Sequence, residues 1–228
     1  MHEVLNDGKE MLSVRVFAPG AKAVTVIEKK GRKKKFEAQL IHDDGFFEAV
    51  ITSRKKWFPY TLRIEYNDGN IYETADKYSF RPTVSEYDRY LYGAGTHYEI
   101  YKKLGAHLCN VDGTDGVSFA VWAPNAKSIS IIGSFNYWDG RTAQMRMLGN
   151  SGIWELFVPE AAEFDKYKFR IKDRNGKTVD KSDPFGFYSE IRPMKASIVY
   201  DLGVYRWKDS EWLEKREKSD VYREPLNI

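Results

Sequence analysis

Residues 116–141, GVSFAVWAPNAKSISIIGSFNYWDGR, decide the fold of this chain. Phe119 and Val121 alternate with smaller residues, which is the period of a half-buried β-strand. A proline breaks this run, and a second alternating run follows at 128–131. The next eight residues, GSFNYWDG at 133–140, read as a turn, although turns are usually built from small polar residues. The segment therefore predicts two β-strands followed by a turn that combines Trp138 with Asn136 and Asp139.

The same strand pattern occurs twice in the chain. Phe17-Ala-Pro corresponds to Trp122-Ala-Pro, 105 residues later. Three further segments recur at a spacing of 107 residues: GFFE and GIWE (45–48, 152–155), YTLRI and YKFRI (60–64, 167–171), DKYSF and DPFGF (76–80, 183–187). The spacing grows within the interval that holds the aromatic turn, where the first copy has the basic segment 29–35 and no tryptophan. The sequence thus predicts one duplicated unit, with the aromatic turn in the second copy only.

The duplicated pattern predicts an all-β chain of two tandem immunoglobulin-like β-sandwiches joined by a short helical linker. Turn residues recur about every 8–12 residues, which is typical of such sandwiches. Thr96 and Glu99 have the spacing of a capping box, and Gly105 suits a helix end, so a helix is expected at 97–104. Near the end of the chain, Asp209 is expected to cap a second helical segment that carries Trp212.

Composition limits the classes of function. The chain has 228 residues, of which 42% are hydrophobic and 15% aromatic, as in a folded globular protein. The basic clusters at 29–35 and 54–56 come without a nucleic-acid recognition motif, so no nucleic-acid partner is expected. There is no secretory signal pattern, no apolar run near ~18 residues and a single cysteine, Cys109, so we expect a cytoplasmic protein that does not bind membranes.

No pattern of catalytic or metal-binding residues is visible. Asp43 and Asp44 are the only promising adjacent acidic pair, and they precede Gly45 in a predicted hairpin turn. The four histidines and Cys109 lack the spacing of metal ligands, and no glycine-rich phosphate loop is present. We therefore expect no catalytic residues, no metal and no cofactor in this chain.

The aromatic turn carries a resemblance to a known family. A strand ending in Trp122-Ala-Pro-Asn-Ala, followed by a strand that runs into Gly133-Ser-Phe-Asn-x-Trp, resembles the family 48 carbohydrate-binding module, an immunoglobulin-like sandwich that accompanies α-glucan enzymes. With Asp139-Gly-Arg141 and Met145-Arg146, the chain is most similar to the N-terminal region of bacterial glycogen (1,4-α-glucan) branching enzymes. The resemblance implies a parent enzyme that transfers α-1,4 chains to form α-1,6 branches on a separate catalytic barrel.

The resemblance also implies a domain organisation. The expected ranges are a first sandwich at 1–92, a helical linker at 93–110, a family 48 module at 111–203 and an exit segment at 204–228 that leads toward the barrel. Because a barrel of about 250 residues cannot fit in this sequence, the chain is expected to be a truncated, non-catalytic piece of the parent.

A sugar site is expected on the second copy. Glucose rings have apolar C–H faces and a rim of hydroxyls, so they need an aromatic platform beside fixed polar groups. The resemblance matches Trp138 to the family's ring-stacking tryptophan and Lys168 to its sugar-contacting lysine. Residue type and strand alternation add Asn136, Asp139 and Arg170 as substrate-binding candidates. The second stacking tryptophan of glycogen-binding relatives is missing, because residues 177–179 are Lys-Thr-Val.

Other roles for these residues remain open. Trp138 can instead pack against the catalytic barrel, together with Arg141, or be buried in its own sandwich. Trp207 and Trp212 are expected at the junction with the barrel. The predicted function is a non-catalytic region that binds α-glucan, such as glycogen or maltooligosaccharides; the alternative is a structural region that positions and stabilises the barrel without binding sugar.

Overall fold

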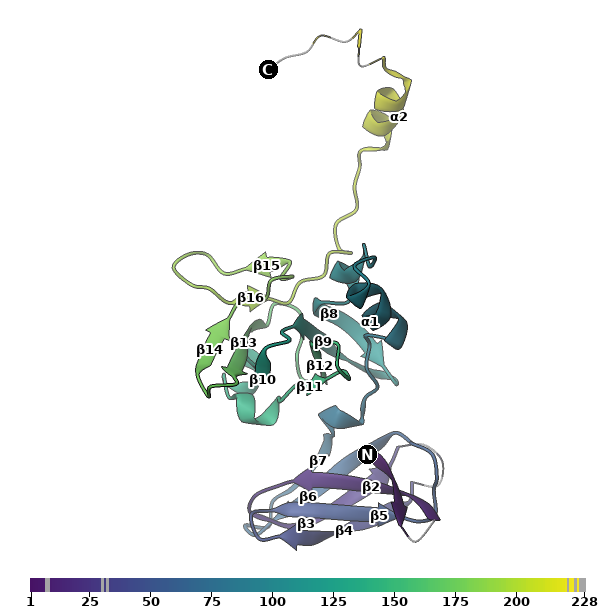
Figure 1. Ribbon diagram of the computed structural model, residues 1–228, viewed down its shortest axis with the longest axis vertical. Coiled ribbons are helices and arrows are strands. Elements are labelled where there is room, and N and C mark those ends of the chain that lie inside the picture. The colour runs from purple at the N-terminus through teal and green to yellow at the C-terminus, as the bar shows by residue number, and fades with distance from the viewer. Residues whose placement is uncertain (7–8, 30, 32, 221, 224, 226–228) are drawn as a thin grey trace.

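A computed structural model describes the chain except for residues 7–8, 30, 32, 221, 224 and 226–228. It contains two β-sandwiches in sequence order, followed by an extended segment and a C-terminal helix (Figure 1). The predicted all-β class with two tandem sandwiches is confirmed. Within the described residues, no helix has the length and apolar character needed to cross a membrane.

The first sandwich is one antiparallel sheet that folds back on itself. Its strands are β1 (His2–Asn6), β2 (Lys9–Phe17), β3 (Ala21–Glu28), β4 (Lys35–His42), β5 (Phe46–Ile51), β6 (Tyr60–Tyr66) and β7 (Ile71–Ala75). The order is β1-β2-β5-β4-β3-β6-β7, so β4 pairs with strands of both layers. Alternate residues such as Val14, Val26 and Phe47 point inward and form the core between the layers.

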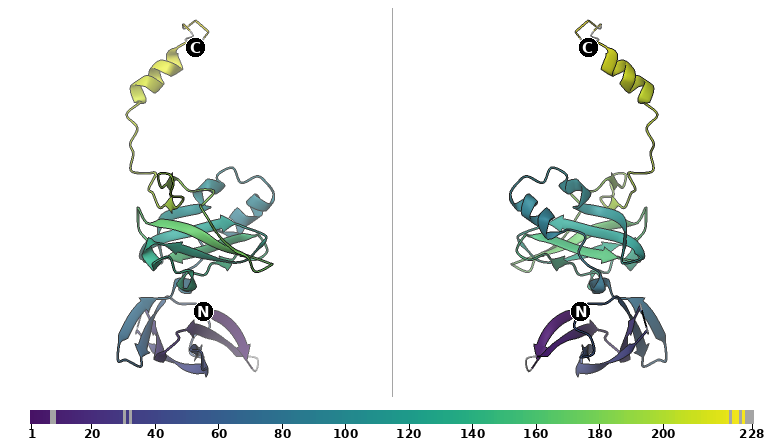
Figure 2. Two further views of the ribbon diagram at one scale, coloured as in Figure 1. Left: turned by 90° about the vertical axis from the view of Figure 1, so that its left-hand side faces the viewer. Right: turned by 90° about the vertical axis from the view of Figure 1, so that its right-hand side faces the viewer.

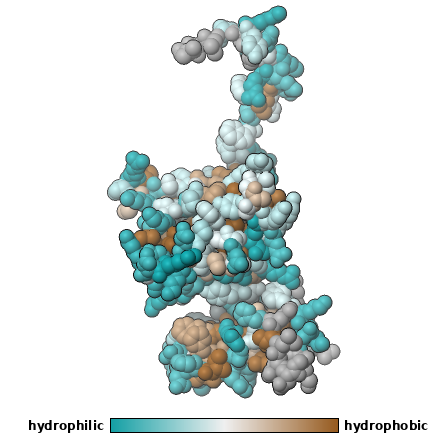
Figure 3. Space-filling view, in the orientation of Figure 1, coloured by the Kyte–Doolittle hydropathy of each residue, from teal (hydrophilic) through white to brown (hydrophobic). Residues whose placement is uncertain are grey.

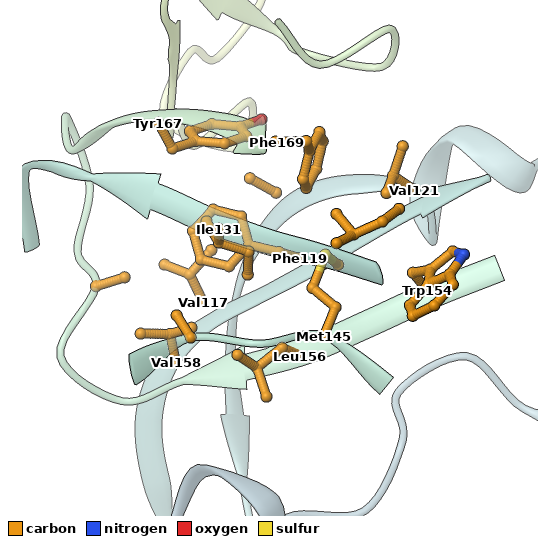
Figure 4. Packing of buried hydrophobic residues seen from close by; sticks show 14 of the residues in the cluster. Val117, Phe119, Val121, Ile131, Met145, Trp154, Leu156, Val158, Tyr167 and Phe169 are labelled. Carbon is orange, nitrogen blue, oxygen red and sulfur yellow. The ribbon is translucent and has the colours of Figure 1, made fainter. Parts of the chain in front are cut away.

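The second sandwich consists of two antiparallel sheets. One holds β8 (Gly105–Val111), β9 (Thr114–Trp122), β12 (Ile153–Val158) and β11 (Arg146–Met147); the other holds β10 (Ala126–Gly133), β13 (Lys166–Asp173), β14 (Thr178–Lys181), β16 (Ser197–Ile198) and β15 (Tyr188–Ser189). Figure 4 shows the core between them, where Phe119 packs edge-on against Tyr167 at 4.9 Å between ring centroids. Trp154 lies in this core, as expected, and its indole Nε1 donates to the Ala123 carbonyl at 3.0 Å.

The duplication extends to strand register and to single hydrogen bonds. Phe17 pairs with Phe46 in the first copy, and their equivalents Trp122 and Ile153 pair in the second. Both copies also have a register shift at the start of the third strand of the unit, between residues 21 and 23 and between 126 and 128. In each copy a buried tyrosine hydroxyl donates to the equivalent aspartate: Tyr60 donates to Asp76, and Tyr167 donates to Asp183. The repeat seen in the sequence is therefore a repeat of the fold.

The predicted helix at 97–104 is wrong. The helix is α1 (Glu86–Gly93), and its capping box is formed by Ser85 and Asp88. Thr96 instead belongs to the end of α1, where its amide donates to the Leu91 carbonyl at 3.0 Å. The segment after it makes only the 3-10 turn η2 (Ile100–Lys102), and Gly105 begins β8 rather than ending a helix.

The linker is packed onto the outer face of the second sandwich. Val84 and Leu104 are buried against Ala120, Leu148 and Ile153. The helix α1 therefore covers the β9–β12 sheet and does more than connect two domains. The expected domain ranges stay a prediction.

A buried polar network holds the segment before α1 against the second sandwich. The Glu155 carboxylate is completely buried and accepts from the backbone amide and the hydroxyl of Thr83. Arg146 donates to Glu155 at 3.3 Å and to the Phe80 carbonyl at 2.8 Å. The Phe80 ring lies 4.6 Å from that of Phe157. Apolar contact and charge-assisted hydrogen bonds thus hold the end of the first sandwich against the second.

The predicted C-terminal helix is present as α2 (Ser210–Lys218). Asp209 occupies its N-cap position, but its side chain makes no capping hydrogen bond, so that part of the prediction is wrong. Both views in Figure 2 show α2 standing clear of the second sandwich at the end of the extended segment.

Candidate functional site

The aromatic turn is held closed by a buried asparagine. Asn136, which is only 8% exposed, accepts from the Gly133 amide and donates to the Ile131 carbonyl, each at 2.9 Å. Both polar ends of its side chain are thereby used by the backbone. Asn136 therefore shapes the turn, and its amide is not available to a sugar, in contrast to the sequence-based expectation.

Two consecutive aromatic residues in this turn have left-handed backbone conformations. Tyr137 has φ 54° and Trp138 has φ 61°, and neither is a glycine. Such conformations cost about 1–3 kcal/mol each and persist only where the surroundings hold them. The Trp138 amide is held by the Gly133 carbonyl at 2.9 Å. The chain thus accepts backbone strain that turns two aromatic side chains outward.

The turn folds over β10 and presents Trp138 beside β13. Gly140 packs so closely that a Cβ there would lie 2.7 Å from the Ser130 Cβ. Trp138 remains 39% exposed, and the Lys168 ammonium lies 6.0 Å from its ring centroid. The structure therefore brings together the two residues that the resemblance assigned to sugar contact.

Tyr137 is a second exposed aromatic residue of the turn and was missed by sequence reasoning. Its side chain is 94% exposed, next to Trp138 in the turn. The sequence offered one signal for its exposure, namely its position next to Trp138 in the predicted turn. A left-handed conformation of a tyrosine cannot be read from strand periodicity.

Arg170 lies on the same outward face of β13 as Lys168, two residues further along. Its guanidinium forms two hydrogen bonds with Asp180 of the neighbouring strand β14, at 2.9 and 3.0 Å. This pairing lowers the pKa of Asp180, and the charge of Lys168 adds to the effect. Asp180, another residue missed from the sequence, thus keeps a carboxylate and a guanidinium in fixed positions on this face.

Asp139 and Arg141 form an exposed ion pair at the end of the turn. The Arg141 guanidinium contacts Asp139 Oδ2 at 2.6 Å, and the Arg141 amide donates to Oδ1 at 3.0 Å. These bonds lower the pKa of Asp139 from 3.8 to about 2. Asp139 therefore stays ionised throughout the neutral range and can accept hydrogen bonds from hydroxyl groups.

The Asp139 carboxyl is expected to titrate near pH 2. Because its pKa is lowered by folding, the pair stabilises the turn fully above pH 3.8, and this contribution is lost as the pH falls through about 2. Replacing Arg141 by alanine removes the guanidinium but keeps the backbone donor, so the Asp139 pKa is expected to rise toward 3.8. Carboxyl chemical shifts measured by NMR against pH check this. An Asp139 titration that is unchanged in Arg141→Ala would show that the ion pair does not form.

The predicted interdomain residues project away from the fold. Arg141 is 89% exposed in its side chain. Trp207 packs edge-on against Tyr205 at 5.0 Å, and Trp212 lies under the Arg216 guanidinium at 5.1 Å. Figure 3 shows the extended segment and α2 rising above the second sandwich. Their role at a junction with another domain stays a prediction.

The chemistry of the turn and of β13 suits binding. An exposed indole and a phenol lie in the turn with the Asp139 carboxylate, and two cationic groups lie on β13 with Asp180 on β14 beside them. The carboxylates of Asp139 and Asp180 have lowered pKa values, which suits hydrogen-bond acceptance and not proton donation. Among the residues that the structure describes, no group of three or more His, Cys, Asp or Glu side chains could hold a metal ion.

Comparisons with known proteins identify both sandwiches. Residues 103–186 match the family model of carbohydrate-binding module 48 (isoamylase N-terminal domain), and residues 1–78 match that of the N-terminal domain of alpha-1,4-glucan branching enzyme GlgB. Among solved structures, a pullulanase complexed with maltotetraose from Anoxybacillus sp. is 14% identical, with a TM-score of 0.38 over 83% of this chain and 25% of that chain. A TM-score of this size supports no statement about the site.

Curated relatives match along the whole chain. The 1,4-alpha-glucan branching enzyme GlgB of Trichodesmium erythraeum is 45% identical over 100% of this chain, and that of Myxococcus xanthus is 43% identical over 94%. The chain spans 29% of the length of each of these relatives. Over its length the chain is therefore similar to the N-terminal region of GlgB branching enzymes, with a match to the GlgB N-terminal domain in its first sandwich and a match to carbohydrate-binding module 48 in its second.

Proposed function

We propose that the second sandwich binds α-glucan on the surface formed by Trp138, Tyr137 and the outward face of β13. The observation that carries the proposal is the exposed indole of Trp138, held beside Lys168 by a strained turn. The left-handed backbone at Trp138 costs the domain free energy, whereas the partly exposed indole offers a sugar ring a stacking partner. The relatives named as 1,4-alpha-glucan branching enzymes indicate the class of sugar.

Recognition on this surface divides into stacking and hydrogen bonding. The C–H face of a glucose ring packs on the Trp138 indole, and the ring hydroxyls reach Lys168, Asp139 and the Arg170–Asp180 pair. Asp180 directly follows residues 177–179, where the second tryptophan of glycogen-binding relatives is missing, so polar contacts replace half of the aromatic clamp. Binding is therefore expected to be weaker and more dependent on Trp138 than a two-tryptophan clamp.

In a longer parent enzyme, such a module raises the local concentration of substrate. A chain held on the sandwich stays near a linked active site, and effective concentrations of millimolar order follow from short linkers. We infer that the parent is a branching enzyme that cleaves α-1,4 chains and transfers them to 6-hydroxyls, and that this region holds glycogen or maltooligosaccharides for it.

Replacing Trp138 by alanine is expected to weaken maltoheptaose binding by at least tenfold. Truncation of a central stacking ring commonly costs about 2 kcal/mol or more, which is a factor of about 30 in affinity. Isothermal titration of the 228-residue chain gives the affinities. Trp212→Ala is the matched control, because Trp212 is also exposed but lies on α2. Equal affinities of Trp138→Ala and Trp212→Ala would contradict the proposal.

The second candidate function is structural positioning of the rest of the parent. It is favoured by the exposed Trp207 and Trp212 on the extended segment and on α2, and by the exposed Arg141. In the intact parent, this role predicts that Trp207→Ala and Trp212→Ala lower the melting temperature and leave glycogen retention unchanged. Glucan binding on Trp138 predicts instead that Trp138→Ala lowers glycogen retention and leaves the melting temperature unchanged.

A further inference from the structure

A second concave surface lies where the extended segment leaves the second sandwich, on different elements from Trp138. It is a groove of about 310 Å³ lined by residues of η2, β8 and the segment 200–202, together with Phe187. Four of its eight lining residues are aromatic, and the others are Lys102, Leu108, Asp201 and Leu202. We call it the aromatic groove and define it by Tyr101, His107, Phe187, Tyr200 and Asp201.

Two groups of aromatic rings include lining residues of this groove, and the first extends from Tyr200 to Tyr188 and Phe164 beside it. The Tyr200 ring lies 5.4 Å from that of Tyr188 and 6.1 Å from that of Phe164, between centroids. On the other wall, His107 packs edge-on against Phe187 at 5.3 Å. None of these residues belongs to the three hydrophobic core clusters of the described chain. The rings therefore lie outside the core: Phe164 and Tyr188 are exposed, and His107, Phe187 and Tyr200 are half-buried.

Phe164 shows the same strained presentation as Trp138. Its φ is 68°, and its side chain is 61% exposed. The backbone there is fixed by bonds from the Phe164 amide to the Val199 carbonyl at 2.8 Å and from the Val199 amide to the Asp165 carbonyl at 2.9 Å. A glycine would adopt this conformation without strain, and an exposed phenylalanine buries little apolar surface. The position thus keeps an aromatic side chain outward at a cost to the fold.

The polar groups of the groove suit a neutral, hydroxylated ligand. The hydroxyls of Tyr101 and Tyr200 have no hydrogen-bond partner among the described residues. Asp201 uses Oδ1 to accept from the Gly203 amide at 2.7 Å, so its second oxygen can accept from a ligand. The neighbouring Lys102 is paired with Glu99, so it adds no unbalanced charge. Flat aromatic walls with free phenol hydroxyls and one carboxylate match the C–H faces and hydroxyl rim of a sugar.

We propose that the aromatic groove is a second α-glucan site on the same sandwich. It rests on the proposed function, because the class of sugar is taken from the Trp138 surface. The groove volume lies at the lower end of the range of about 300–1,000 Å³ for small-molecule sites, so it holds a short stretch of a chain. Trp138 lies on another part of the sandwich, so one long glucan chain can occupy both sites at once. The chain is therefore expected to bind long glucans more tightly than short ones.

The test uses a double variant in the 228-residue chain, called the groove variant: Tyr101→Ala in the groove and Phe164→Gly beside Tyr200 at its edge. Maltoheptaose affinity is measured by isothermal titration for the unaltered chain, the groove variant, Trp138→Ala and their combination. The groove variant is expected to bind three- to tenfold more weakly, and the combination is expected to show no heat at millimolar sugar. Phe164→Gly alone is expected to keep or raise the melting temperature, because glycine relieves the strain at φ 68°. If Phe164→Gly weakens binding without lowering the melting temperature, the Phe164 ring contacts the sugar and does not act through the stability of the fold.

The outcomes separate this inference from the proposed function. If the groove variant binds as tightly as the unaltered chain, the groove is not a glucan site, and the Trp138 result still decides the proposed function. If Trp138→Ala is without effect and the groove variant loses binding, the proposed function fails at its surface and the groove is the site. Cellohexaose, a β-linked chain with the same hydroxyls, is the ligand control, and equal affinity for it at the groove would contradict an α-glucan site.

Discussion

Replacing Glu155 by alanine is expected to destabilise the second sandwich by about 3–5 kcal/mol. The carboxylate is completely buried, and its removal leaves the Arg146 guanidinium, the Thr83 amide and the Thr83 hydroxyl without their common acceptor. Breaking a buried charge pair from one side has a cost of this size. Urea unfolding of this variant, of a matched control variant and of the unaltered chain, followed by circular dichroism, measures the effect.

The duplicated fold provides a matched control. Glu48 occupies the equivalent position in the first sandwich, where it accepts from Ser13 at 2.6 Å and from Arg15 at 2.9 Å. Its side chain is partly exposed, so Glu48→Ala is expected to cost about 1 kcal/mol or less. Equal destabilisation by the two variants would show that the linker does not depend on the Glu155 network. Faster amide exchange at Thr83 in Glu155→Ala alone is expected if it does.

Asn136→Ala is expected to lower both stability and glucan affinity. The Gly133 amide and the Ile131 carbonyl lose their side-chain partner inside the turn, and each buried unsatisfied group costs about 1–3 kcal/mol. Because the same turn holds Trp138 in its strained conformation, its loosening removes the stacking surface. We expect at least tenfold weaker binding of maltoheptaose together with a lower melting temperature.

Asn175→Ala is the control for this prediction, because Asn175 lies exposed in the β13–β14 hairpin. It is expected to change neither quantity. If Asn136→Ala lowered affinity while leaving the melting temperature unchanged, Asn136 would be a direct sugar contact, as the sequence first suggested. Unchanged affinity in a destabilised variant would show that Trp138 does not need the turn.

The duplication made the strands predictable from the sequence. A period of two assigns inward and outward residues, and the matched segments indicate that both copies share one strand pairing, as Phe17 with Phe46 and Trp122 with Ile153 confirm. The helix was misplaced because residues 85–88 and 96–99 both carry a capping pattern. Residues 84 and 104 are buried against the second sandwich, and this contact favours a helix that starts at the capping pattern 85–88. Such a tertiary contact cannot be recognised from the neighbouring residues in the sequence.

The site was only partly predictable. The motif located Trp138 and Lys168, and in the fold the Lys168 Nζ lies 6.0 Å from the centroid of the Trp138 ring. It misassigned Asn136, because whether an amide points to solvent or to the backbone depends on how the turn closes. It missed Tyr137, whose exposure follows from a left-handed φ that tyrosine rarely adopts. The residues of the aromatic groove are far apart in sequence and are joined only by the fold.

Contact between an α-glucan and Trp138 is the event on which the proposed function depends most, and indole NMR measures that contact directly. The six tryptophans of the chain give separate Nε1–H signals, which single Trp→Phe variants assign. On addition of maltoheptaose, we expect the Trp138 signal to shift in a saturable manner. The signal of Trp154, whose indole is bonded to Ala123 in the core, is expected to stay in place. A Trp138 signal that does not move at saturating sugar would contradict the central claim.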